Sequence, residues 1–82
     1  MTPRLKTLSG REVLRELGRV GFTVARTRGS HATLVRITQA GQRQVLTVPL
    51  HKELAAGTLH AIYRQASKFL PIDVLYPLFF HT

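Results

Sequence analysis

The apolar positions near the start of the chain recur with the period of a helix. One side of this segment carries Val13, Leu14, Leu17 and Val20. Arginines fall mostly on the other side, so the helix is amphipathic. Ser9 and Glu12 have capping-box spacing, in which the Ser9 hydroxyl accepts from the Glu12 backbone N–H and the Glu12 carboxylate reaches back. A helix is therefore predicted to begin after Ser9 and to end before Gly21, which can adopt a left-handed C-terminal conformation.

Three segments rich in β-branched residues follow, separated by short turns that contain glycine. The segments are residues 22–28, 31–38 and 44–49. Short links between such segments predict an antiparallel meander. Within the second segment, alternation separates two sets of side chains. One face receives His31, Thr33, Val35 and Ile37, and the other receives Ala32, Leu34, Arg36 and Thr38.

A second amphipathic helix is predicted after residue 57, with Thr58 as its N-cap. Its apolar stripe is Leu59, Ile62, Tyr63, Ala66 and Phe69. The resulting order is helix, three strands, helix, which defines an α+β fold. In this arrangement both helices cover one face of the sheet and the other face remains in contact with solvent.

The last fourteen residues, 69–82, form an apolar C-terminal extension to the core at 9–68. This tail has one charged residue and is interrupted by Pro71 and Pro77. It is shorter than the ~20 apolar residues that span a bilayer. Two alternatives remain open: the tail packs back on the core, or it forms an exposed apolar patch for self-association or for a partner. A chain of 82 residues accommodates one domain, here 1–82.

The charge of the chain is strongly positive, with 12 Lys and Arg against 4 Asp and Glu and a net charge of +8. Such a potential attracts polyanions: nucleic acid, an anionic membrane surface or an acidic protein. The absence of cysteine excludes disulfides and thiolate chemistry. No His-x3-His pair or acidic cluster occurs, so we expect no metal and no cofactor. No apolar run near Met1 resembles a signal peptide, and we expect a cytoplasmic protein.

Candidate chemistry is concentrated at Arg28-Gly29-Ser30-His31, at the mouth of the second predicted strand. Histidine exchanges a proton near neutral pH, and glycine permits close approach of a ligand. Gly29 and Ser30 can offer backbone N–H groups and a hydroxyl to a phosphate. A Ser30–His31 catalytic pair is excluded, because adjacent side chains of a strand point to opposite faces. The competing interpretations are a structural histidine and a glycine that only satisfies a turn.

Basic residues near this segment are expected to contact phosphate groups. The set predicted to cluster around His31 is Arg26, Arg28, Arg36 and Lys52. His51 follows the third strand, and the sequence does not decide whether it reaches the same end of the sheet as His31. A loop histidine that holds the backbone is the alternative for His51. Phe22 and Tyr63 are expected in the core, so base stacking on aromatic side chains is not supported.

The chain resembles the HicA family of small bacterial toxins, mRNA interferases that pair with HicB antitoxins. The matching stretches are residues 9–14, 17–22, 28–31, 48–51, 53–54, 57–59 and 62–66. This resemblance implies a fold like that of double-stranded RNA-binding domains, with His31 as the catalytic histidine and His51 as a second family histidine. The family ordinarily ends soon after the second helix, and the apolar run beyond Ser67 departs from that pattern.

Together these observations predict a metal-independent endoribonuclease that cleaves mRNA and is held inactive by an acidic HicB-like antitoxin. His31 would serve as general base on the ribose 2′-OH or as the acid that protonates the leaving 5′-oxygen. Two alternatives stay open. One is a non-catalytic RNA-binding module of the double-stranded-RNA-binding type, and the other is a protein-interaction domain whose charge serves an acidic partner.

Overall fold

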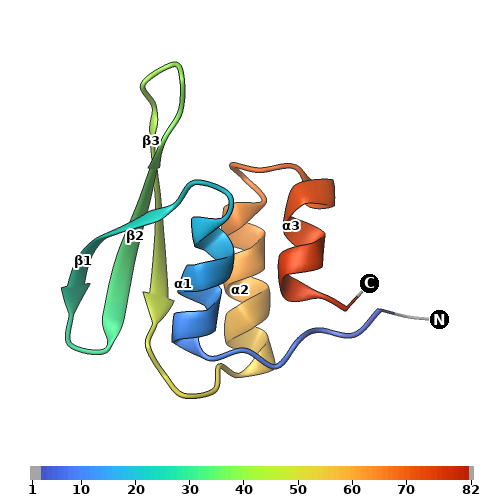
Figure 1. Cartoon of the computed structure of the whole chain (residues 1–82). Coiled ribbons are helices and arrows are strands. Elements are labelled where there is room, and N and C mark those ends of the chain that lie inside the picture. Colours follow the sequence, from blue (N-terminus) through green and yellow to red (C-terminus); the bar gives the residue numbers. More distant parts are fainter. Residues whose placement is uncertain (1–2, 82) are drawn as a thin grey trace.

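The predicted order of helix, three strands and helix is confirmed, and a further helix follows it. The computed structural model describes residues 3–81 (Figure 1). The elements are α1 (Gly10–Gly18), β1 (Thr23–Arg28), β2 (His31–Ile37), β3 (Arg43–Pro49), α2 (Ala56–Ala66) and α3 (Ile72–Phe79). The strands form an antiparallel sheet in the order β1-β2-β3, and each strand boundary lies within one residue of the predicted one.

The start of α1 is fixed by the predicted capping box. The Glu12 backbone N–H donates to Ser9 Oγ at 3.1 Å, and the Ser9 backbone N–H donates to Glu12 Oε1 at 2.9 Å. These bonds satisfy two of the donors that a helix N-terminus leaves without partners. The helix ends at Gly18, and Gly21 adopts a positive φ of 100° in the turn before β1. Val13 and Leu17 are fully buried against the sheet.

The predicted start of the second helix is wrong by three residues, because the N-cap is Ala55 rather than Thr58 and α2 begins at Ala56. Leu54 is buried, and its backbone N–H donates to the Leu8 carbonyl at 2.9 Å, which anchors the loop at that point. Ala55 is extended and acts as the N-cap without a side-chain hydrogen bond. Thr58 therefore lies inside the first turn of the helix rather than at its cap.

Both central helices lie on one face of the sheet, as predicted. Figure 1 shows α1 and α2 on the same side of the strands, to their right in that view. The strand residues that face them are buried: Ala32, Leu34, Leu46 and Val48. The alternate residues of the same strands remain accessible on the opposite face, which we call the open face. It includes Thr33, Val35, Val45 and Thr47.

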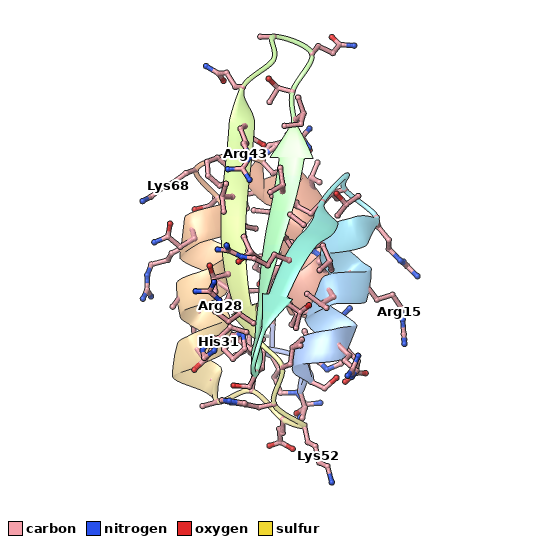
Figure 2. All side chains as sticks on the ribbon, turned by 90° about the vertical axis from the view of Figure 1, so that its left-hand side faces the viewer. Arg15, Arg28, His31, Arg43, Lys52 and Lys68 are labelled. Carbon is pink, nitrogen blue, oxygen red and sulfur yellow. The ribbon has the colours of Figure 1, made fainter. Side chains whose placement is uncertain are left out.

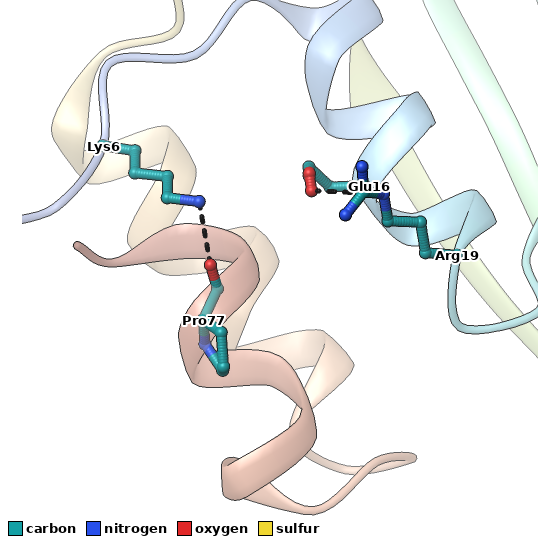
Figure 3. Close-up of polar contacts among 4 residues, drawn as sticks. All are labelled: Lys6, Glu16, Arg19 and Pro77. Carbon is teal, nitrogen blue, oxygen red and sulfur yellow. Dashed lines mark hydrogen bonds and ion pairs between the residues drawn. The ribbon is translucent and has the colours of Figure 1, made fainter. Parts of the chain in front are cut away.

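The C-terminal tail packs back on the core and forms a third layer against α2 (Figure 1). Leu75, Leu78 and Phe79 of α3 are buried. The Lys6 ammonium donates to the Pro77 carbonyl at 2.8 Å (Figure 3), which satisfies a carbonyl in the last turn of α3. Of the two alternatives for the tail, packing on the core holds for these residues, although Ile72 remains 63% exposed. Among residues 3–81, no helix has the length and apolarity needed to cross a bilayer.

Candidate functional site

His31 is the first residue of β2 and lies directly opposite Arg28 of β1. Only Gly29 and Ser30 separate the two, so a two-residue turn closes this hairpin. Gly29 has φ of +59°, and glycine at the first central position is typical of a type II′ hairpin turn. A Cβ atom on Gly29 would meet nothing within 4 Å, so this position needs glycine for its conformation rather than for space. The turn accounts for Gly29 in the fold, and a phosphate contact by Gly29 or Ser30 stays a prediction.

A bulge in β1 places its two arginines on the open face together with His31. Arg26 lies opposite Thr33 and Arg28 opposite His31, whereas Val24 lies opposite the buried Leu34. Residues 24, 26 and 28 would share one face of a regular strand. The register shift between Val24 and Arg26 separates them. Bulges re-aim side chains in this way, and here the result is a pair of cations beside a histidine.

A groove of about 390 Å³ lies between β3 and α2, and His31 forms part of its wall. The buried side chains of Leu46 and Ile62 lie at its base. The remaining lining residues come from β3 (Val45, Thr47 and Pro49) and from α2 (Thr58, Ala61 and Gln65). In Figure 2, His31 lies over the lower part of the sheet on the side of α2, with Arg28 next to it.

The structure places His51 at the same end of the sheet as His31. Pro49 is the partner of His31 in the β2–β3 pairing, and the Leu50 backbone N–H donates to the Ser30 carbonyl at 2.6 Å. His51 follows directly. Its carbonyl accepts from the Gly10 backbone N–H at 2.9 Å, so the backbone of His51 holds the start of α1. Its side chain is exposed.

The predicted cluster of four cations is wrong for Arg36. This residue lies five positions along β2 from His31 and opposite Gln44, on the face that the helices cover. Its guanidinium donates to Gln44 Oε1 at 2.7 Å. Arg26 and Arg28 lie on the open face, and Lys52 is exposed just beyond the end of β3 (Figure 2).

Sequence reasoning missed the α2 side of the groove. Thr58, Ala61 and Gln65 are spaced three and four residues apart, so they form one stripe along the helix. This stripe borders the buried stripe that includes Ile62. The spacing was available in the sequence, but the position of α2 next to β3 was not. Within residues 3–81, no three His, Asp or Glu side chains gather where they could hold a metal ion.

Comparison with known proteins assigns the family. No curated protein matches the chain with significant similarity. The family model described as the HicA toxin of bacterial toxin-antitoxin matches residues 10–67. The match runs from the first residue of α1 to the residue after α2 and includes the β1–β2 hairpin with His31, while α3 lies outside it. Since the match covers most of the chain, the protein belongs to the HicA family of toxins from bacterial toxin-antitoxin systems.

Proposed function

We propose that this toxin is a metal-independent endoribonuclease that cleaves mRNA in the cytoplasm, with His31 as its general acid or base. The observation that carries this proposal is the position of His31 directly opposite Arg28 on the open face of the sheet. A proton-transfer group and a phosphate-binding cation are thereby adjacent. The net charge of +8 supports a polyanionic substrate.

The proposed reaction uses the ribose 2′-oxygen of the substrate as the nucleophile. The 2′-oxygen forms its bond to phosphorus as the P–O5′ bond breaks. His31 either accepts the 2′-OH proton or donates a proton to the leaving 5′-oxygen, and solvent water serves as the partner for the other proton transfer. The products carry a 2′,3′-cyclic phosphate and a 5′-hydroxyl. General acid–base catalysis of this kind contributes ~10² to 10⁴ in rate. The need for a 2′-OH accounts for RNA rather than DNA as the substrate.

Arg28 is assigned the role of stabilising the negative charge that develops on the phosphate. Arg26 and Lys52 would contact neighbouring phosphates, and Gly29 and Ser30 would add hydrogen-bond donors at the turn. His51, at the same end of the sheet, is a secondary candidate for proton transfer or phosphate binding. The hairpin geometry and the position of His51 and Lys52 at the same end of the sheet support these proposed roles, and mutagenesis will test each of them.

The proposed partner in the toxin-antitoxin system is a HicB-like antitoxin with an acidic surface. Covering His31 and Arg28 would neutralise opposed charge and hide the reacting group at the same time. The exposure of both side chains leaves them accessible to such a protein.

The test is incubation of the purified protein with RNA in EDTA, followed by analysis of the product ends. Wild-type protein should cleave and leave 2′,3′-cyclic phosphates, and His31→Ala should bind RNA without cleaving it. His81→Ala, at the far end of the chain, serves as the matched control and should cleave normally. Metal-dependent cleavage with 5′-phosphate products contradicts the mechanism. RNA binding without cleavage by the wild type favours the non-catalytic RNA-binding module.

A further inference from the structure

We infer that the groove between β3 and α2 holds the nucleobase of a nucleotide adjacent to the phosphate cleaved at His31. The inference rests on the proposed function and adds a base-binding site to it. The groove measures about 390 Å³ and has His31 in its wall. Ligand pockets usually measure ~300 to 1,000 Å³, so the groove suits a small group rather than a duplex or a folded partner.

The lining of the groove matches an uncharged ligand. None of the residues that line it is Lys, Arg, Asp or Glu. The floor of the groove is made of Leu46 and Ile62, both nearly fully buried, and its sides include Pro49 and Ala61. Apolar surfaces of this kind cover the faces of a nucleobase, whereas a phosphate would find no Lys or Arg in the lining. The cations that suit a phosphate lie outside the groove, on β1.

Polar groups in the groove could hydrogen-bond the edge of a base. Thr47, Thr58 and Gln65 contribute two hydroxyl groups and one amide. The Gln65 amide both donates and accepts, which is the combination that a base edge presents. Contact with these apolar side chains, with an amide at the edge of the base, would take the place of the aromatic stacking that the strands do not offer.

The position of the groove places its contents next to the reaction. Its His31 end is defined by the pairing of His31 with Pro49, the last residue of β3. Val45 lies four residues back along β3, about 13 Å away at ~3.3 Å per residue. A phosphate bound by Arg28 at His31 therefore lies at one end of the groove, and the attached nucleotide can extend its base along β3.

Filling the groove should block this site without disturbing His31. Ala61→Phe adds a bulky ring at an exposed α2 position in the lining, and Ala56→Phe makes the same change at an exposed α2 position outside it. We expect Ala61→Phe to lower kcat/KM for RNA by about tenfold, equivalent to ~1.4 kcal/mol, and Ala56→Phe to change it little. Gln65→Leu should alter which base is preferred at the cleavage position. Melting temperatures confirm that each variant is folded.

Direct binding provides a second measurement that does not depend on cleavage. The four ribonucleoside 3′-monophosphates are titrated into the protein and followed by NMR. Shifts at the backbone amides of Thr47 and Ala61, lost in Ala61→Phe, support the inference. The inference is overturned if the nucleotides shift only the amide signals of β1, or if Ala61→Phe cleaves RNA as well as Ala56→Phe. It is also overturned when Ala61→Phe weakens antitoxin binding while the nucleotides leave the groove unperturbed. Failure of the wild type to cleave RNA rejects the proposed function alone, because the titration still reports on the groove.

Discussion

Arg28 lies directly opposite His31 across the β1–β2 hairpin, and both side chains project from the face of the sheet that no helix covers. A two-residue turn with glycine at its first position fixes this pairing. The relation between the two side chains therefore depends on backbone hydrogen bonds and not on a flexible loop. Such placement on a rigid element suits the proposed roles of His31 as the reacting group and Arg28 as its phosphate-binding neighbour.

The first prediction concerns the RNA path that we propose along β1. Replacing Arg28 by Gln should flatten the log-log salt dependence of single-strand RNA binding by about 0.7, the value for one lost phosphate contact. Arg36→Gln is the matched control, since Arg36 lies on the opposite face and bonds Gln44. Filter binding over a range of salt concentrations measures both slopes. Equal flattening by the two variants would show that RNA does not follow the open face.

The second prediction concerns the close approach of Gly10 to the end of β3. A Cβ atom at Gly10 would collide with the Pro49 carbonyl, whereas one at Gly18 would meet nothing within 4 Å. Gly10→Ala should therefore destabilise the fold by about 1–3 kcal/mol. Gly18→Ala should stabilise it by about 0.5–1 kcal/mol, because alanine has the higher helix propensity. Urea unfolding measures both, and a stable Gly10→Ala protein would mean that this contact adjusts without cost.

Much of the fold could be predicted from the sequence because its determinants are local. The Ser9 and Glu12 capping box, the β-branched segments and the glycine turns each act within a few residues. By contrast, α3 depends on distant contacts. It contains Pro77 and has no side-chain cap. Its aromatic residues pack on other elements, and the ring centroids of Phe79 and Tyr63 of α2 lie 5.5 Å apart. The hydrophobic period of residues 72–79 alone therefore does not predict α3, which is stabilised by its packing on the rest of the fold.

The candidate site could be predicted only in part, for a similar reason. The segment around His31 is contiguous, and its turn chemistry is visible in the sequence. The bulge at β1 is not, since residues 24, 26 and 28 have the spacing of a single face. Strand alternation correctly places Arg36 on the face of β2 opposite to His31. The prediction that Arg36 clusters with His31 is inconsistent with this alternation. The groove requires the packing of α2 against β3, which no local pattern encodes.

The third prediction concerns acid stability. The backbone hydrogen bond from Ser9, followed by the bond with its side chain, holds the pKa of Glu12 below its usual value of 4.5. A carboxylate with a lowered pKa stabilises the fold at pH values above its unfolded-state pKa. This contribution is lost as the pH falls through the folded-state pKa. Glu12→Gln should therefore have a lower melting temperature than the wild type at pH 7, and the melting temperatures of the two proteins should converge at acidic pH. A difference that stays constant with pH would contradict this role.

The fourth prediction separates the stability of α3 from the chemistry at His31. Leu75 is fully buried, whereas Ile72 is 63% exposed. Leu75→Ala should cost about 2–5 kcal/mol of unfolding free energy, and Ile72→Ala should cost little. Below its melting temperature, Leu75→Ala should cleave RNA at the wild-type rate, because α3 lies behind the helices and away from the open face (Figure 1). A folded Leu75→Ala protein without activity would show that cleavage at His31 depends on the packing of α3.

The fifth prediction concerns the antitoxin. If an acidic antitoxin covers His31 and Arg28, Arg28→Glu should weaken its binding and RNA binding alike, because the substitution reverses the charge that both partners neutralise. Ile72→Glu is the control for docking on α3, where Ile72 and Val74 are exposed. It should leave both affinities unchanged. Calorimetric titration of each variant with the cognate antitoxin measures the effect. Loss of antitoxin affinity in Ile72→Glu, with Arg28→Glu unaffected, would place the antitoxin on α3 and would leave inhibition to an indirect mechanism.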